Sequence, residues 1–437
     1  MRQSHWFIRI SIVILLLGKC LCNSFAQSLQ PASPEEVGLS SFRLKRIQKI
    51  IQNHIEKGEL AGTVTLIARH GKIVQHEAFG QMSIEEGIPM TRDAIFRIAS
   101  MTKVFTSIAV MILYEEGRFS LHDPISKYIP QFKDMKVVIW PNNKPQDIPL
   151  ITEPSKRPII IRDLLRHTAG FSYGHGFYDL DKMYKEAGMN PRSLTPWQGT
   201  LNEFVESISK LPLVHHPGTI WVYSYATDIL GYLIEIIASE PLDKFLEKRV
   251  FRPLGLKDTY FIIPQSKLNR FPNLYKYANG DLELVESAAS SNFRNMPSAL
   301  SGGGGWTSTG YGGIVTTALD FTKMLQLFLN GGILDGQRLL SRKTVELMMR
   351  NHLPGIQSDM LGPGVNFGLM SAVLTSPGKY GELGTKGQVW WAGSCNTYFF
   401  VDPKEEMIGV LMTQIHPFGH LGLMGKFKRL CMQMIVD

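Results

Sequence analysis

Apolar positions near the start of the chain alternate between a helical and a strand-like spacing. Leucine and isoleucine recur with helical spacing after Ser40 and Ser41, which predicts an amphipathic helix that one of these serines caps and that ends near Lys57. Residues 61–79 carry two β-type runs around a turn at His70–Gly71, which predicts a hairpin. A helix followed by a hairpin indicates a sheet with a helix packed on it.

The same two spacings return towards the end of the chain. Residues 318–329 have helical spacing, and runs at 388–394, 397–401 and 407–412 predict successive antiparallel strands before a final helix over about 421–434. Strands at both ends, with helices and loops between them, predict an α+β fold. In such a fold, an antiparallel sheet formed by the N- and C-terminal segments is flanked by helices and holds a mainly helical insertion.

Residues 100–115 predict a helix that is apolar around most of its circumference and therefore buried. Ser100 and Lys103 stand at its N-terminal end. Residues three apart share a helix face, so this spacing brings an amine to a hydroxyl where backbone N–H groups are unpaired. A serine nucleophile needs such a base and such donors. An N-cap serine followed by a solvated lysine has the same pattern, so the pair alone does not decide between the two.

The first 26 residues have the order of a secretory signal peptide. Two arginines within residues 1–9 precede an apolar run at residues 10–17, and Ser24 and Ala26 place small side chains at the two positions that a signal peptidase reads before a cleavage site after Ala26. The apolar run is too short to span a bilayer comfortably. We therefore expect an exported protein, periplasmic or extracellular, whose mature chain (27–437) has no stable membrane span.

Composition removes several classes of function. The formal net charge is +8, but lysines and arginines are scattered without a dense basic run, which argues against nucleic-acid binding. Only Cys395 and Cys431 remain after signal removal, so at most one disulfide is possible. The glycine-rich stretches 301–305 and 310–313 lack the Gly-Lys-Ser/Thr of a phosphate loop. No acidic or cysteine cluster accompanies His215–His216, so we expect no metal site there.

A second serine has to be weighed against Ser100. Residues 170–174, Gly-Phe-Ser-Tyr-Gly, fit the Gly-x-Ser-x-Gly pattern of the α/β-hydrolase elbow and make Ser172 an alternative nucleophile. That elbow needs a buried strand directly before it and a helix directly after it. Residues 159–170 instead predict a strand-like start and a short helix that Gly170 ends, with a loop to follow. The elements predicted on either side of Ser172 therefore argue against it as the nucleophile.

Several short motifs along the chain resemble those of one enzyme superfamily in order and spacing. They are residues 34–39, 100–103, 161–170, 217–219 with 221–224, 253–256 and 401–403. Together they resemble the serine β-lactamase and penicillin-binding-protein superfamily, most closely class C β-lactamases and the esterases built on that fold. The resemblance covers essentially the whole mature chain, and it implies that Ser100 is the nucleophile.

The resemblance also implies roles for two further motifs. The superfamily's Tyr-x-Asn motif stands here as Tyr223-Ser224-Tyr225, so the role of general base or proton relay passes to Tyr223, whereas Tyr225 replaces an amide donor. The Lys-Thr-Gly motif stands as Trp391-Ala392-Gly393, so a bulky apolar ring replaces the cation that would meet a β-lactam carboxylate. Some esterases of this fold carry a Trp-x-Gly motif in that place. Both departures favour neutral ester substrates.

We therefore expect a secreted serine hydrolase that cleaves small-molecule esters through an acyl-enzyme on Ser100, with Lys103 and Tyr223 moving the proton. The oxyanion is expected between the backbone N–H groups of Ser100 and Ser394, with Ser394 on the edge strand. No metal or organic cofactor is implied. The other expected substrate-binding residues are Trp391, Gly393 and Tyr225.

Two alternatives stay open at this point. One is a β-lactamase or a D-alanyl-D-alanine carboxypeptidase or transpeptidase of the same fold, which would cleave amides. The other is a catalytically silent protein that binds peptidoglycan fragments in the same pocket. In each case the resemblance implies one domain with an α/β part at about 33–95 and 300–437 and a helical part at about 96–299.

Overall fold

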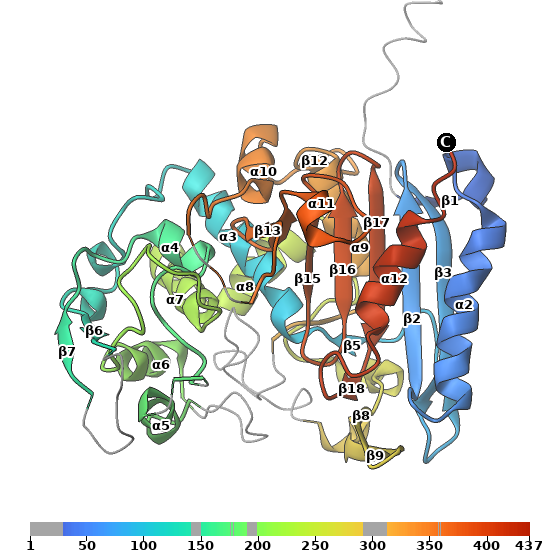
Figure 1. The fold of residues 1–437 in the computed structure, drawn as a ribbon, viewed down its shortest axis with the longest axis horizontal. Helices are drawn as coiled ribbons and strands as arrows, with labels where there is room; N and C mark the ends of the chain where they lie inside the picture. The colour runs from blue at the N-terminus through green and yellow to red at the C-terminus, as the bar shows by residue number, and fades with distance from the viewer. Residues whose placement is uncertain are drawn as a thin grey trace, which may run out of the picture.

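The computed structural model describes residues 29–140, 150–174, 176–177, 179–189, 199–291, 313–356, 358 and 360–437. A strand-rich part, built from both ends of the chain, lies beside a mainly helical part built from the middle (Figure 1). The predicted signal peptide and the glycine-rich stretches, except for Gly313, lie outside the described residues.

A nine-stranded sheet joins the two ends of the chain. Its order is β1-β3-β2-β17-β16-β15-β14-β13, and β4 pairs with β3. The β1–β3 pair is parallel and the other pairs of this sheet are antiparallel, so the sheet predicted as antiparallel is mixed at one edge. The hairpin and the three C-terminal strands expected from the sequence are confirmed. The strands are β1 Gln30–Pro31, β2 Gly62–Arg69, β3 Lys72–Ser83, β4 Ile88–Pro89, β13 Val365–Phe367, β14 Ala372–Leu374, β15 Val389–Ala392, β16 Tyr398–Asp402 and β17 Met407–Thr413.

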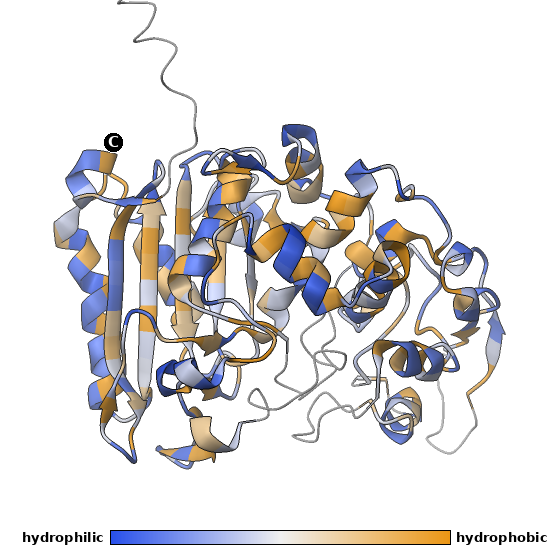
Figure 2. Ribbon diagram, turned by 180° about the vertical axis from the view of Figure 1, so that it is seen from behind, coloured by the Kyte–Doolittle hydropathy of each residue, from blue (hydrophilic) through white to orange (hydrophobic). Residues whose placement is uncertain are grey.

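Both faces of this sheet are covered, which explains why β2 and β17 are buried along their whole length. On one face, α2 and α12 pack Ile47 and Phe427 against strand residues such as Phe400. On the other face, the Phe321 ring of α9 lies 5.4 Å from the Phe399 ring. Figure 2 shows α2 as mostly hydrophilic, whereas the strands beside it carry long hydrophobic stretches. The bounds of these helices are α2 Ser41–Glu56, α9 Ala318–Leu329 and α12 Leu423–Met432.

The predicted buried helix is confirmed as α3, Thr102–Glu115, in which residues 102–113 are all buried. The α-helix begins two residues later than expected, because Ala99–Met101 forms a 3₁₀ turn first. Phe105 of α3 makes edge-to-face contacts with Phe251 and Phe321. Among the described residues, no helix is long and apolar enough to cross a membrane. The other helices are α4 Ile161–Leu165, α5 Asp179–Glu186, α6 Leu201–Ile208, α7 Ala226–Ala238, α8 Leu242–Leu246, α10 Arg342–Met349 and α11 Pro377–Tyr380.

The strand that carries the predicted Trp-Ala-Gly motif is not the edge strand that we expected. β14 and β13 lie outside β15 in the sheet order. However, β14 pairs with β15 at Val389 and Trp390, because β14 begins at Ala372, the partner of Trp390. Beyond that point, at Trp391 and Ala392, β15 has β16 as its recorded neighbour. Among the described residues, Trp391 and Ala392 therefore have no strand partner on the outer side of β15, although the strand as a whole is internal.

The remaining strands form small sheets beside the large one. One of them pairs β5 with β10 directly before the predicted nucleophile, and another joins β18, β8 and β9. Cys395 and Cys431 are both buried and free, so the structure does not contain the single bridge that the sequence allowed. The bounds are β5 Phe96–Arg97, β6 Lys136–Val138, β7 Thr152–Pro154, β8 Leu274–Ala278, β9 Asp281–Glu286, β10 Val315–Thr316, β11 Ile333–Leu334, β12 Gln337–Arg338 and β18 Ile415–His416.

Candidate active site

Ser100 lies in the tight turn between β5 and α3. The residue before it, Ala99, is fully buried and has a φ of 43°. A non-glycine residue in this left-handed region costs on the order of 1 kcal/mol or more, and such strain persists only where the surrounding structure imposes it. The turn places the Ser100 side chain at the N-terminal end of α3, where it lines a pocket.

Lys103 lies one helical turn beyond Ser100 on α3, and it is 2% exposed. Its Nζ donates a hydrogen bond to Ser100 Oγ over 3.3 Å. Burial lowers the pKa of Lys103 to about 7, although the negative charge of Asp228 on α7 opposes this fall. A large fraction of the amine is therefore neutral near neutral pH and able to accept a proton from the hydroxyl.

Tyr223 comes from the segment that leads into α7, and its ring centroid lies 4.8 Å from Lys103 Nζ. The indole Nε1–H of Trp391 donates a hydrogen bond to the Tyr223 hydroxyl over 2.9 Å. Burial raises the pKa of Tyr223 above its ordinary value, and hydrogen bonds with Ser100 and Trp391 counteract only part of the rise. The phenol is therefore protonated in the resting protein.

Aromatic rings pack around Tyr223 in this group of side chains. The rings of His167 and Tyr173 lie 4.8 Å and 5.2 Å from the ring of Tyr223. Burial lowers the pKa of His167, so this imidazole is neutral beside Lys103. Tyr173 also lines the pocket. Tyr173 was not predicted to be a site residue, although it lies within the Gly-Phe-Ser-Tyr-Gly segment of residues 170–174.

Ser172, the alternative nucleophile, lies apart from this group. Its Oγ accepts a hydrogen bond from the Gly174 N–H over 3.0 Å, and its own N–H donates to the Tyr184 hydroxyl over 3.1 Å. It is not among the residues that line the pocket. The short helix α4 and a loop precede it in place of a buried strand, so the elbow geometry is missing.

Gly393 and Ser394 follow β15 in a turn that passes close to the segment before Ser100. A Cβ at Gly393 would lie 2.4 Å from the Ile98 carbonyl oxygen and 2.3 Å from Thr397 Oγ1, so only glycine permits this approach. Ser394 lines the same pocket as Ser100. Gly393 therefore holds the two segments together and does not itself line the pocket.

The structure does not bring Tyr225, which was predicted to bind substrate, to the pocket wall. Its ring packs 4.5 Å from the Tyr173 ring and stands behind it, and Tyr225 is 3% exposed. Phe204 and Tyr184 complete its surroundings. The Tyr225 ring, which replaces the amide donor, packs against the side of Tyr173 that faces away from the pocket. Tyr225 therefore does not contact substrate in this arrangement.

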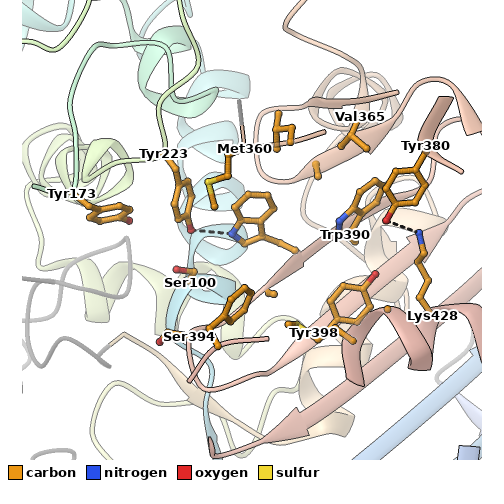
Figure 3. A pocket seen from close by; sticks show the side chains of 17 residues that line it. Ser100, Tyr173, Tyr223, Met360, Val365, Tyr380, Trp390, Ser394, Tyr398 and Lys428 are labelled. Atoms are coloured by element: carbon orange, nitrogen blue, oxygen red, sulfur yellow. Dashed lines mark hydrogen bonds between the residues drawn. The ribbon is translucent and has the colours of Figure 1, made fainter. Parts of the chain in front are cut away.

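The pocket has a volume of about 530 Å³ and mostly apolar walls (Figure 3). Ser100, Tyr173 and Tyr223 line one end of it, and Tyr380 and Lys428 line the other. Within the described residues, no group of three or more His, Cys, Asp or Glu side chains is arranged to hold a metal ion. The arrangement thus combines a serine, a buried amine and a phenol with a largely apolar chamber, which suits acyl transfer by a serine.

Comparisons with known proteins show which family the whole chain resembles. Residues 47–425 match the Beta-lactamase family. Esterase EstB of Burkholderia gladioli is 28% identical over 383 residues, which cover 84% of this chain and 89% of that protein. A Salmonella enteritidis PT4 protein named "Putative D-alanyl-D-alanine carboxypeptidase" is 30% identical over 403 residues, which cover 87% of this chain and 84% of that protein. The solved structure of EstCE1, described as a hydrolase with promiscuous acyltransferase activity, has a TM-score of 0.74 and 25% identity, and covers 90% of this chain and 98% of its own.

Proposed function

This chain belongs to the Beta-lactamase family and is a serine hydrolase, and we propose that it cleaves carboxylic esters through an acyl-enzyme on Ser100. The observation that carries the ester assignment is the position of Trp391. Its ring lines the pocket in place of the lysine of the Lys-Thr-Gly motif, and its N–H is committed to Tyr223. This wall offers apolar area to a neutral group and no cation to a carboxylate.

In the proposed acylation step, Ser100 Oγ attacks the ester carbonyl carbon. Its proton moves to Lys103 Nζ, the nearest amine, because the pKa of Lys103 is low and that of Tyr223 is high. The C–O bond of the tetrahedral intermediate then breaks, and the Tyr223 phenol donates a proton to the departing alkoxide. The Lys103 ammonium returns a proton to the Tyr223 oxygen. In the deacylation step, water attacks the acyl-enzyme carbonyl with the same proton transfers, and the carboxylic acid is released from Ser100.

The developing oxyanion is assigned to the backbone N–H groups of Ser100 and Ser394. Both residues line the pocket, and the close approach at Gly393 keeps their two segments together. Donors held in this way are already oriented before charge develops, so little reorganisation accompanies the reaction. The left-handed conformation of Ala99 directly before Ser100 supports this assignment, because such strain persists where the surrounding structure imposes it.

Amide cleavage is the second candidate, because the Salmonella relative carries the name of a carboxypeptidase. A single panel separates the candidates: rates on short neutral esters, on a β-lactam and on a D-Ala-D-Ala peptide. The ester proposal requires the esters to be turned over most efficiently. A peptide or β-lactam that matches them would overturn it.

The first prediction from this mechanism concerns pH. We expect kcat/KM for a neutral ester to rise about tenfold per pH unit below pH 7 and to level off above it, since Lys103 has a pKa of about 7 and must be neutral to act as base. The measurement is a pH–rate profile on a p-nitrophenyl ester, with Lys103→Met as the control that should remove most of the activity. A profile that is flat across pH 7 would contradict the role of Lys103.

We further propose that the protein is exported after cleavage at Ala26. The order of charged, apolar and small residues in positions 1–26 supports this proposal. Mass analysis of the exported protein should give an N-terminus at or near Gln27. An intact Met1, or a lipid on Cys20 or Cys22, would refute it.

A further inference from the structure

The pocket extends beyond the group around Ser100 and reaches the opposite face of the sheet. Trp390 and Trp391 are adjacent on β15, so their side chains point to opposite faces. Trp391 packs with Tyr223 on the Ser100 side, and Trp390 packs with the α12 side, yet both line the same pocket. The pocket passes between the two faces beside Ala372 at the start of β14, beyond which β15 has no outer strand partner among the described residues.

We call the part of the pocket on the α12 side the distal compartment, and it is lined by Tyr380, Trp390, Tyr398 and Lys428. Lys428 Nζ lies 4.3 Å from the centre of the Tyr380 ring and 4.9 Å from that of Trp390. It also donates a hydrogen bond to the Tyr380 hydroxyl over 3.3 Å. Figure 3 shows this cluster at the far end of the pocket from Ser100 and Tyr223.

Lys428 is a buried cation that faces the cavity without a carboxylate of its own. It is 2% exposed, and among the described residues no Asp or Glu oxygen lies within ion-pair distance of its Nζ. Glu382, whose charge acts on Lys428, is paired with Arg429. Asp402 accepts hydrogen bonds from Thr385 and Gln388.

The ammonium form nevertheless persists at neutral pH. Burial lowers the pKa of Lys428 to about 8, with Arg429 acting in the same direction and Glu382 and Asp402 opposing it. Aromatic faces recover only part of the cost of burying a cation, on the order of 1–2 kcal/mol. A carboxylate brought in by a ligand would supply the missing counter-charge.

We propose that the distal compartment binds a carboxylate at the end of one arm of the substrate, so that this hydrolase acts on esters that carry a free acid at a distance from the scissile bond. The inference rests on the proposed ester hydrolysis at Ser100. Lys428 supplies the cation and Tyr380 the hydroxyl, while Trp390 and the apolar middle of the pocket, Met360, Leu361 and Val365, cover the chain between the two ends.

The test compares matched p-nitrophenyl esters whose acyl chains end either in a methyl group or in a carboxylate, in a length series from succinate to sebacate. A second series carries the same two ends on the alcohol arm. In one of the two series we expect a preference of at least about tenfold in kcat/KM for the carboxylate at an optimal length. Lys428→Met should abolish that preference, so that the ratio of kcat/KM for the carboxylate-ended ester to that for the methyl-ended ester falls to about one, whereas Lys428→Arg should retain part of the preference.

Lys426→Met is the matched control, because Lys426 lies on the same helix but does not line the pocket. Calorimetry with the Ser100→Ala variant reads the binding of both kinds of ester without turnover, and the tighter binding of the carboxylate should again depend on Lys428. If kcat/KM and affinity are the same for carboxylate-ended and methyl-ended esters in both series, the distal assignment is overturned and the ester proposal stays intact. Carboxylate binding without hydrolysis of any ester would instead overturn the ester proposal and support the distal site.

Discussion

Replacing Ser100 by alanine is expected to lower the hydrolysis of a p-nitrophenyl ester by at least about a thousandfold, because no acyl-enzyme can then form. The prediction depends on the 3.3 Å contact between Ser100 Oγ and Lys103 Nζ and on the place of both groups at the start of a buried helix. Both side chains are 4% exposed or less. The substitution removes one oxygen atom from a rigid turn, so we expect the variant to fold normally.

Ser172→Ala is the matched control for this experiment. Ser172 is also buried, but it does not line the pocket, and its Oγ accepts a hydrogen bond from the nearby Gly174 N–H. This variant should keep most of the activity. Labelling with a fluorophosphonate should add one phosphonyl group to the unaltered protein and none to Ser100→Ala. Loss of activity in Ser172→Ala alone, or the absence of any label on the unaltered protein, would overturn the assignment; the second result would favour a silent binding protein.

The features that the sequence predicted well are those that depend on local spacing. The three-residue interval between Ser100 and Lys103 puts the two side chains on one side of the helix start, where the structure has their polar atoms 3.3 Å apart. Alternating or continuous apolar runs likewise predicted β2, β16 and β17, which are buried on both faces. The fold class followed from the same runs together with the family resemblance.

The features that the sequence did not predict depend on pairings between distant segments. Trp391 was expected to contact substrate, but its hydrogen bond to Tyr223 joins residues 168 positions apart and no local pattern signals it. β13 and β14 were missed because each has three residues, too few to show a period. Without them β15 was placed at the edge. No local pattern distinguishes Lys428 from the other lysines in the sequence. Its position in the pocket depends on the packing of α12, which places it against Tyr380 and Trp390.

The largest effect on substrate choice is expected at Trp391. We expect kcat/KM on a short neutral ester to exceed that on benzylpenicillin or a cephalosporin by at least ~100-fold, which is roughly 2.7 kcal/mol of differential transition-state binding. The carboxylate of a β-lactam lies next to the scissile bond, so it meets the Trp391 ring and is desolvated without a cation. Lys428 cannot compensate, because it lies in the distal compartment on the other face of β15.

Trp391→Lys tests this reason directly, and Trp391→Phe is its control. Both variants lose the N–H that bonds the Tyr223 hydroxyl over 2.9 Å, so both should hydrolyse the ester more slowly, by about tenfold for one hydrogen bond. Only the lysine variant should gain β-lactam turnover, because only it supplies a cation beside the reacting carbonyl. The gain should be modest, since Tyr225 stands where the lactamases carry an amide donor and packs behind Tyr173. Comparable efficiencies on ester and β-lactam in the unaltered protein would reject the ester assignment, and equal β-lactam rates in the two variants would reject charge as its cause.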